Sequence, residues 1–368
     1  MKAHILYSKY LDEARSRITI GGVQTYITNL IDVLQHQGYE VSLYQCAQED
    51  FSVEWDGIKV YGIKYHSEKG RSVGGKLFEC CKQYANPQTD LIVFATDTLI
   101  VNCNGFRTIA IQHGIFWDIP KRKYSSKLKY FIEYINKCRQ AWSTIRRCSL
   151  VDSLVCVDYN FINWYRALVP FSKVNLYAIP NFTTIPKEID KSNDKLTVIF
   201  ARRFFEYRGT RIFADAISDT LKHHDIKVIV AGEGPDEPYL KDKLGWSHNV
   251  EFMRYNSEKS LKIHEKCDIA VVPTVGSEGT SLSLLEAMAS KCAVICTNVG
   301  GMTNIVLDHY NGLLISPSSA QLKDALEKLI INKDLRIQIA NKAYETASIS
   351  FCLDKWRKDW ESVLKGLI

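Results

Sequence analysis

Short runs of aliphatic and β-branched residues alternate with helical patterns along most of the chain, and no other feature limits its fold as strongly. The N-terminal run ILYS is followed by a polar stretch, a helical pattern at 21–37 and the alternating run YEVSLY at 39–44. Val23 and Ile27 recur at helical spacing, and Gly38 predicts the end of this helix. A strand, a helix and a second strand in this order indicate a β-α-β unit, which requires a parallel sheet.

The same alternation starts again after a linker at 180–194, whose Pro, Thr, Asn and Asp content is typical of a loop. The runs that follow include LTVIFARR, IKVIVAGEG, DIAVVPT and AVICTNV, with helical segments between them. A chain of 368 residues is too long for one ordinary core. The sequence therefore predicts an α/β fold with two doubly wound, Rossmann-like domains, 1–180 and 181–349, that face a central cleft.

The composition excludes several other classes of protein. Apolar residues make up 46% and charged residues 24% of the chain, as in ordinary globular proteins. The longest apolar runs fall well short of the roughly 20 residues that a membrane-spanning helix needs. The 11 cysteines are an odd number without any C-x-x-C spacing, which favours reduced thiols over a disulfide framework or a zinc site. We therefore expect a cytoplasmic protein.

Two glutamates flank the start of one predicted helix in the second domain. The strand DIAVVPT leads through a short loop to Glu278, and Glu286 lies inside the helical pattern that follows. Thr280 or Ser281 can cap this helix, whose first N–H groups would form an anion site in the crevice. The two acids are about 12 Å apart along the helix axis, beyond the roughly 5 to 9.5 Å of paired glycosidase carboxylates. A ligand with an anionic centre and hydroxyl groups at both ends fits this spacing, and a nucleotide sugar has that form.

The two acids belong to the segment SEGTSLSLLEAMA at 277–289, which resembles the E-x7-E motif of retaining glycosyltransferases of the GT-B fold, family 4. Other motifs similar to those of that family follow one another in the family's order along most of the chain. They are GGVQTYI (21–27), IQHG (111–114), IPNF (179–182), ARRFFEYRGT (201–210), GEGP (232–235), NVGGMTNIV (298–306) and NGLLI (311–315). Two positions differ, because Phe182 stands where the family has glycine and Arg208 where it has lysine.

The resemblance implies a role for each matching position. Glu286 would hold the ribose hydroxyls of the donor, and Glu278 would lie beside the transferred sugar. Arg203 and Arg208 would neutralise the diphosphate as it leaves, and His113 would touch the donor sugar. Phosphate or sugar would also meet the backbone N–H groups of Gly279, Thr280, Ser281, Leu282 and Ser283.

The resemblance also implies the roles of the domains. Domain 1–180 would bind the acceptor, domain 181–349 would bind the nucleotide sugar, and the helical pattern at about 350–368 would pack back on the first domain. Gly21 and Gly22 would let the backbone approach the diphosphate or the acceptor.

The chemistry implied by the resemblance is transfer with retention of configuration. The expected donor is UDP- or GDP-linked, and the expected acceptor is a glycan or a lipid-linked molecule of surface polysaccharide synthesis. The sequence contains no D-x-D metal motif, so arginines and a helix N-terminus would supply the positive charge. We expect no metal and no cofactor besides the donor.

Several of these residues have a structural alternative. Glu286 could be an ordinary half-buried helix residue, and His113 could be a hydrogen-bonded histidine at a strand end. The arginines at 202, 203 and 208 could be surface ion-pair partners, and Arg202 could share the role of Arg203. Arg254 follows the run NVEFM, near the place where relatives hold the base, and its guanidinium could stack on that base.

The segment 121–147 carries nine basic residues against one acid, Glu133. Apolar residues recur among them at helical spacing, at Leu128, Phe131, Ile132 and Ile135. This pattern fits an interfacial helix on anionic lipid, which would make the protein peripheral on the inner face of the membrane. A solvated helix face over the domain core is the open alternative. We expect no nucleic acid, because no recognition module accompanies the basic segment.

Two other functions remain open at this point. A nucleotide-sugar epimerase could have the same two-domain shape but would act without an acceptor. A catalytically silent subunit that binds a membrane or a partner could also keep this fold. The set of Glu278, Glu286, Arg203 and Arg208 favours the transferase over both.

Overall fold

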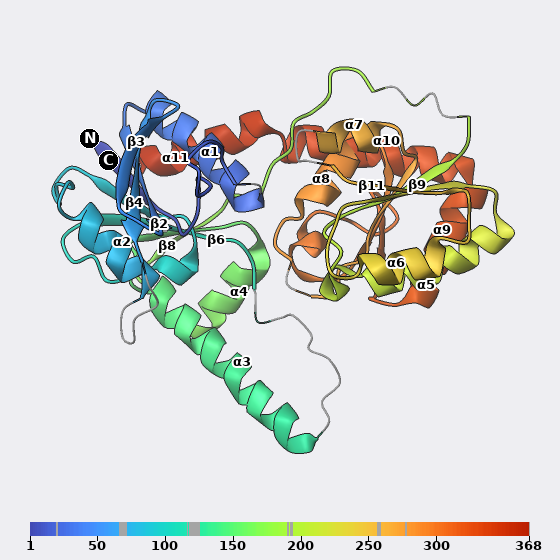
Figure 1. The fold of residues 1–368 in the computed structure, drawn as a ribbon, viewed down its shortest axis with the longest axis horizontal. Coiled ribbons are helices and arrows are strands. Elements are labelled where there is room, and N and C mark those ends of the chain that lie inside the picture. Colours follow the sequence, from blue (N-terminus) through green and yellow to red (C-terminus); the bar gives the residue numbers. More distant parts are fainter. Residues whose placement is uncertain are drawn as a thin grey trace. The chain divides into compact units, whose positions relative to one another are not determined.

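The structure, a computed structural model, describes residues 1–19, 21–65, 72–115, 117, 126–189, 191, 194–255, 259–276 and 278–367 (Figure 1). The chain divides into two compact units. Unit 1 comprises Met1–His113, Lys123–Ile179 and Arg357–Ile368, and unit 2 comprises Gly114–Arg122 and Pro180–Trp356.

Unit 1 is built on an eight-stranded sheet in the order β3-β4-β2-β1-β5-β6-β7-β8. All neighbouring strands are parallel except β3 and β4, which form an antiparallel edge pair. The strands are β1 (Lys2–Leu6), β2 (Glu40–Ala47), β3 (Phe51–Trp55), β4 (Ile58–Lys64), β5 (Leu91–Phe94), β6 (Arg107–Gln112), β7 (Ser153–Cys156) and β8 (Asn175–Ala178). Between them lie α1 (Gly22–His36), α2 (Val73–Cys81), the 3₁₀ turn η1 (Asp97–Leu99), α3 (Lys127–Cys148) and α4 (Tyr159–Leu168).

The C-terminal helix α11 (Leu353–Lys365) contributes its last part to unit 1. The indole Nε1 of Trp360 donates a hydrogen bond of 2.9 Å to the hydroxyl of Tyr26 on α1. Arg107, at the start of β6, donates a bond of 2.9 Å to the carbonyl of Leu367. These long-range bonds fix the end of the chain on the sheet that its first residues build.

Unit 2 is built on a six-stranded, fully parallel sheet in the order β11-β10-β9-β12-β13-β14. The strands are β9 (Thr197–Ala201), β10 (Lys227–Ala231), β11 (Val250–Met253), β12 (Ile269–Val272), β13 (Ala293–Thr297) and β14 (Leu313–Ile315). Their connections contain η3 (Glu206–Arg208), α5 (Thr210–His223), α6 (Glu237–Leu244), α7 (Ser260–Glu265), α8 (Leu282–Ala289), η5 (Gly300–Asn304), α9 (Ser319–Ile331) and α10 (Lys333–Ser350).

The strands of unit 2 are apolar on both faces, as a parallel sheet covered by helices requires. On β9, Val198 and Phe200 belong to one core cluster, whereas Ile199 and Ala201 belong to a second one. This two-residue alternation places the clusters on opposite faces of the sheet. The structure confirms the predicted α/β fold class with two parallel-sheet, Rossmann-like units.

Each sheet has one place where the strand order reverses. In unit 2 the reversal lies between β9 and β12, and in unit 1 it lies between β1 and β5. Loops that leave the carboxyl ends of such neighbouring strands diverge to opposite sides and leave a crevice, where α/β proteins bind ligands. None of the helices that the structure describes combines the length and apolar character needed to cross a membrane.

Candidate active site

The strand reversal of unit 2 brings together two loops that carry charged residues. Arg202 directly follows β9, and Thr274 and Glu278 follow β12. Because β9 and β12 are parallel neighbours, both loops leave the same edge of the sheet. Residues 72 positions apart in the sequence are therefore in contact, as the bond between Arg202 and Thr274 shows.

Glu278 is the centre of a compact hydrogen-bonded group. Its Oε2 accepts from Arg202 Nη2 at 2.6 Å, from Arg208 Nη1, and from Thr274 Oγ1 at 3.1 Å. Arg202 Nη1 also donates to Thr274 Oγ1 at 2.7 Å. The side chains of Arg202, Arg208 and Glu278 are only 5%, 17% and 10% exposed. We call these four residues the Glu278 cluster.

The cluster is electrostatically asymmetric. Burial alone would raise the pKa of Glu278, but the positive charges of Arg202 and Arg208 outweigh it and hold that pKa below its ordinary value. Glu278 is therefore ionised at neutral pH. Two guanidinium groups against one carboxylate leave a net positive charge at a ligand-binding edge of the sheet, which favours an anionic ligand.

Two glycines allow the backbone to carry the cluster. Gly232 has φ +143°, and a Cβ there would lie 1.9 Å from the carbonyl oxygen of Arg202. Gly300 has φ +55°, and a Cβ there would lie 2.0 Å from the carbonyl oxygen of Glu278. The neighbouring Gly301 N–H donates to that same oxygen at 2.9 Å. The glycine motifs at 232–235 and 298–306 thus hold the loops that present the cluster, since no other residue fits these approaches.

The start of α8 lies just after the cluster. Ser281 occupies the N-cap position, but its hydroxyl makes no capping bond to the described backbone and pairs instead with Ser283 Oγ at 3.3 Å. The expected cap by the Ser281 side chain is therefore not formed. Asn181 of the IPNF motif donates to the carbonyl of Thr280 at 2.7 Å and so ties the linker to the residue just before the helix start.

Glu286 lies inside α8, away from the Glu278 cluster. Its Oε2 accepts a hydrogen bond of 2.6 Å from Ser260 Oγ on α7. Burial raises the pKa of Glu286 to about 7, although the bond from Ser260 acts in the opposite direction. Burial, helped by the Glu286 charge, also raises the pKa of the Tyr255 phenol to about 12.

The raised pKa of Glu286 predicts a pH-dependent affinity for a hydroxyl-bearing ligand. Only the ionised carboxylate accepts hydrogen bonds with both oxygens, so the affinity for a nucleotide should rise as the pH increases from 6 to 8. The slope below pH 7 should approach tenfold per pH unit. Calorimetric titration at several pH values measures it, and Glu286→Gln should remove most of the dependence.

Protein stability provides the control for this titration. A carboxyl group with a higher pKa in the folded chain than its ordinary value of 4.5 stabilises the fold while protonated, and this contribution is lost as the pH rises from about 4.5 to above 7. Without ligand, Glu286→Gln should therefore gain stability relative to the wild type as the pH rises through this window. An affinity that does not change with pH in the wild type would contradict the assignment of Glu286.

His113 belongs to unit 1 and follows the carboxyl end of β6. Its Nε2 lies 2.9 Å from the carbonyl oxygen of Ala95, which follows β5, and its ring meets the Tyr26 ring edge-on at 5.2 Å. Burial lowers the pKa of His113 to about 4, so the ring is neutral at pH 7. The bond to Ala95 requires the proton on Nε2, which makes Nδ1 a hydrogen-bond acceptor.

The glycines of the first motif lie at the start of α1. Gly21 is the N-cap residue and Gly22 is the first residue of the helix. Gly21 has an extended backbone with φ 172°, and a Cβ there would meet only the flexible end of Gln24. The conformation of Gly21 itself therefore does not demand glycine, and the open surface at Gly22 is the feature available to a ligand.

The structure places Arg202, not Arg203, in the Glu278 cluster beside Arg208. The backbone N–H of Arg202 donates to the carbonyl of Ala231 and so continues the pairing of β9 with β10 by one residue. This pairing directs the Arg202 side chain toward the carboxyl edge of the sheet. Arg203 is exposed in the loop, where its guanidinium carbon lies 5.8 Å from the centre of the Phe205 ring.

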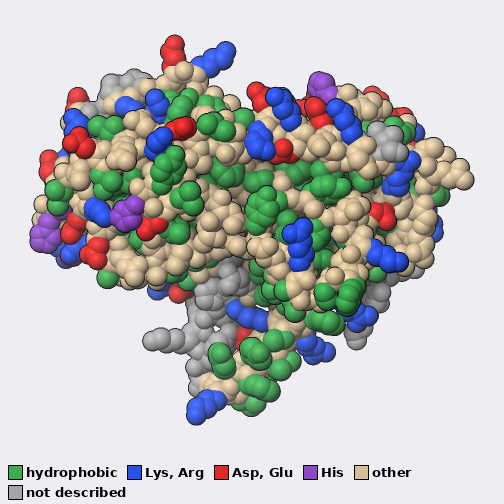
Figure 2. All heavy atoms as spheres, turned by 180° about the vertical axis from the view of Figure 1, so that it is seen from behind, with side chains coloured by type: hydrophobic (Ala, Val, Ile, Leu, Met, Phe, Trp, Pro, Cys, Tyr) green, Lys and Arg blue, Asp and Glu red, His purple; other side chains and the backbone are tan. Residues whose placement is uncertain are grey.

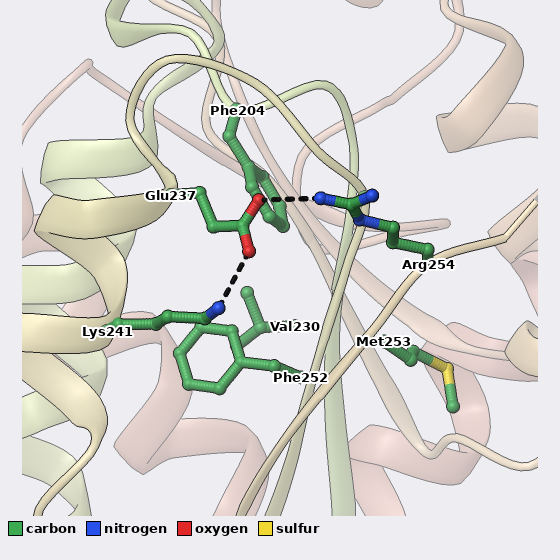
Figure 3. Close-up of a pocket in the computed structure, with 8 residues that line it drawn as sticks. Phe204, Val230, Glu237, Lys241, Phe252, Met253 and Arg254 are labelled. Carbon is green, nitrogen blue, oxygen red and sulfur yellow. Dashed lines mark ion pairs between the residues drawn. The ribbon is translucent and has the colours of Figure 1, made fainter.

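Arg254 lines a pocket of about 330 Å³ at the carboxyl ends of β10 and β11 (Figure 3). It forms ion pairs of 3.6 Å with Glu233 and Glu237, and Glu237 is also paired with Lys241 at 2.8 Å. The apolar walls and floor come from Phe204, Val230, Phe252 and Met253. The pocket is thus lined by charged as well as apolar side chains, and Figure 3 shows the Glu237 carboxylate between Lys241 and Arg254.

Sequence reasoning missed three residues of the site. Thr274 donates to Glu278, and Ser260 donates to Glu286. Asn181 donates to the carbonyl of Thr280 in the loop before α8. Thr274 had a usable signal, because it is a polar residue at the end of an apolar strand. Ser260 carries no comparable signal, since its partner lies 26 positions away in another helix.

The sequence and the fold were compared with known proteins. Residues 181–346 match the family model described as Glycosyl transferases group 1. Uncharacterized glycosyltransferase MJ1178 of Methanocaldococcus jannaschii is 25% identical over 375 residues, which cover 95% of this chain and 93% of that protein. Uncharacterized glycosyltransferase MJ1607 of the same organism is 26% identical over 184 residues, and that match covers 49% of this chain and 47% of the relative.

Solved structures with a similar fold cover the whole chain. HepE of Anabaena in complex with UDP-glucose superposes with a TM-score of 0.71 and 17% identity, over 100% of both chains. WaaG, a glycosyltransferase involved in lipopolysaccharide biosynthesis, superposes with a TM-score of 0.70 and 16% identity, over 99% of this chain and 100% of WaaG. At these identities the structures are evidence for the fold. Together with the family match over residues 181–346, they lead to one conclusion: this part of the chain is similar to the glycosyl transferases group 1, and the protein is a glycosyltransferase with the GT-B fold.

Proposed function

We propose that the protein is a retaining glycosyltransferase that moves a sugar from a UDP- or GDP-linked donor to a glycan or lipid-linked acceptor in surface polysaccharide synthesis. The observation that carries this proposal is the Glu278 cluster at the strand reversal of unit 2. A buried carboxylate, two arginines and an adjacent helix start form a charged site where α/β sheets bind nucleotides. The fold shared with HepE, whose structure contains UDP-glucose, supports the donor class.

Within unit 2, the donor would extend from the pocket of Arg254 to the Glu278 cluster. Glu286 would accept hydrogen bonds from the ribose hydroxyls. The diphosphate would meet the N–H groups of residues 279–283 and the guanidinium groups of Arg202 and Arg208. Glu278 would hold both guanidinium groups in place and accept a hydrogen bond from the sugar through its second oxygen.

The reaction breaks the bond between C1 of the sugar and the diphosphate oxygen, and forms a bond between C1 and an acceptor oxygen. The acceptor proton passes to the departing phosphate oxygen on the same face of the sugar, which retains the configuration. Negative charge develops on the diphosphate, where Arg202 and Arg208 stabilise it. Because two buried guanidinium groups and a helix N-terminus supply this charge, we propose that the transfer needs no metal.

Unit 1 would bind the acceptor. Its strand reversal lies between β1 and β5, where the glycine start of α1 and the loop around Ala95 leave the sheet. Neutral His113, with Nδ1 as an acceptor, is suited to a sugar hydroxyl and not to an anion. Peripheral association with the inner face of the membrane, through the segment 121–147, would bring a lipid-linked acceptor to the enzyme; residues 121–125 lie outside the described part of the chain.

Arg254 provides a prediction about the base of the donor. If its guanidinium stacks on the base, Arg254→Ala should weaken nucleotide binding about 2- to 5-fold. Calorimetry with the preferred nucleotide measures this change. Lys243→Ala is a matched control, since Lys243 lies on the same helix as the pocket residue Lys241 but outside the pocket. Unchanged affinity in Arg254→Ala would remove this residue from the site.

Product analysis tests the proposal as a whole. The protein is incubated with UDP- and GDP-sugars and with short glycan or lipid-linked acceptors, with EDTA or with Mg²⁺. Transfer in EDTA, with the anomeric configuration of the donor kept in the product by NMR, is the expected result. Isomerised nucleotide sugar without any transfer would instead support an epimerase. Binding of nucleotide without any reaction would support a silent subunit.

A further inference from the structure

Most residues of α3 do not pack against the core of unit 1. Only Thr144, Ile145 and Cys148 of its 22 residues are buried, and all three lie in the last turns. The rest of the helix projects away from the sheet of unit 1 (Figure 1). The alternative that this segment forms a solvated face over the domain core therefore does not hold for residues 127–142.

The projecting part of α3 carries an unusual amount of exposed apolar surface. Seven of its large apolar or aromatic residues are between 39% and 68% exposed: Leu128, Tyr130, Phe131, Ile132, Tyr134, Ile135 and Trp142. At 100° per residue, Leu128, Phe131, Ile135 and Trp142 fall within an arc of about 60° on one side of the helix. Figure 2 shows hydrophobic side chains gathered on the projecting part of the unit, with Lys and Arg side chains nearby. Exposed apolar patches of this kind mark interaction surfaces.

The charge of α3 limits the kind of partner. The helix has six basic residues and one acid, Glu133. Lys127 and Lys129 lie in its first turn, which contains no acid, although positive charge at a helix N-terminus opposes the helix dipole. Their position is thus unfavourable for the helix alone and becomes favourable next to an anionic partner.

We propose that residues 127–142 of α3 dock on an anionic lipid bilayer, with the arc of Leu128, Phe131, Ile135 and Trp142 in the acyl boundary. This inference rests on the proposed function, for which it names the membrane-binding surface. Apolar and aromatic side chains enter the interface while lysines and arginines meet lipid phosphates. A second copy of the chain fits less well, because it would bring two helices of net charge +5 together.

The inner end of α3 connects this surface to the proposed acceptor side of unit 1. Arg147 Nε donates to the carbonyl of Asp97 in η1 at 3.3 Å, and its other nitrogens donate to Ser143 and Thr144. η1 follows β5, two residues after the Ala95 carbonyl that binds His113. A bilayer that holds residues 127–142 would therefore be linked, through the buried inner end of α3, to the loop that follows β5 on the proposed acceptor side.

Vesicle sedimentation tests the proposal on the full chain without nucleotide. The wild type should bind vesicles of phosphatidylcholine and phosphatidylglycerol (about 7:3), and should bind pure phosphatidylcholine at least about tenfold more weakly. Lys127→Gln/Lys129→Gln should reduce the partition coefficient roughly 10- to 30-fold. Phe131→Ser/Ile135→Ser should reduce it roughly 10- to 100-fold. Phe171→Ser should change nothing, because this 94% exposed residue lies outside α3.

Three results would overturn the proposal. The first is a wild type that does not bind the anionic vesicles, and the second is α3 variants that bind them as well as the wild type does. The third is a wild-type dimer in sedimentation velocity that the α3 variants convert to monomer. Nucleotide calorimetry on each variant distinguishes a defect in vesicle binding from a defect in the donor site of unit 2. An α3 variant that loses vesicle binding but keeps its nucleotide affinity supports the docking surface. A wild type that binds vesicles but no nucleotide would contradict the proposed transfer and leave the docking surface standing.

Discussion

Arg202→Ala is expected to lower the turnover number about 10²- to 10³-fold, whereas Arg203→Ala should leave turnover within about twofold. The two arginines are adjacent in the sequence, but only Arg202 donates to Glu278 and Thr274. Removing Arg202 also leaves a buried carboxylate with one charged partner fewer, which should lower the free energy of unfolding by up to roughly 3 to 5 kcal/mol. Steady-state kinetics and urea unfolding of both variants measure these effects.

The conservative variant Arg202→Lys serves as a further control for the first prediction. Lysine keeps the positive charge but cannot donate to Thr274 and Glu278 in a fork. It should therefore recover much of the stability lost in Arg202→Ala and only part of the turnover. If Arg203→Ala were the damaged variant and Arg202→Ala retained full turnover, the assignment of Arg202 to the diphosphate would be wrong.

Glu278→Gln is expected to lower turnover by a similar factor, about 10²- to 10³-fold, without weakening the binding of the nucleotide product. Glutamine keeps the size of the side chain but no longer holds two guanidinium groups by charge. It also removes a negative charge beside the diphosphate site, so the affinity for a nucleoside diphosphate should stay the same or increase. A split between turnover and nucleotide affinity therefore identifies a residue that acts on the sugar and the leaving group.

Glu206→Gln is the matched control for Glu278→Gln. Glu206 lies two residues before Arg208 in η3, but it is 47% exposed and forms an ion pair of 3.7 Å with Arg211. This variant should keep both turnover and nucleotide affinity. A Glu278→Gln variant that binds nucleotide much more weakly than the wild type would contradict the separation of the two carboxylate roles.

The sequence predicted the fold class well because the signal is repeated along the whole chain. Apolar runs of strand length alternate with helical patterns in both halves, and each run on its own indicates a strand. On β9, the residues Val198 to Ala201 then fill two opposite cores, as a fully covered parallel strand must.

The candidate site was only partly predictable, for a physical reason. Glu278 was found from its place just before a predicted helix, and Arg208 from the resemblance of the segment ARRFFEYRGT to a family motif. The distinction between Arg202 and Arg203 depends on the Arg202 N–H bond to Ala231, which extends β9 by one residue. A one-residue difference in strand length reverses which side chain enters the site, and no sequence pattern determines it.

The contact between Ser260 and Glu286 could not be predicted either. It depends on how α7 packs on α8, and both helices are short. The same holds for the burial that raises the pKa of Glu286 to about 7, since that burial is a property of the assembled unit.

The central claim is that unit 2 binds a nucleotide through Glu286 and the Glu278 cluster. Calorimetric titration with UDP, GDP and ADP, in EDTA and in Mg²⁺, on the wild type, on Glu286→Ala and on the exposed control Glu345→Ala tests it most directly. We expect the wild type to prefer one nucleotide, with the same affinity in EDTA and in Mg²⁺. Glu286→Ala should weaken this binding about 10²-fold, and Glu345→Ala should leave it unchanged. Binding of none of the three nucleotides, or equal affinity in Glu286→Ala, would contradict it.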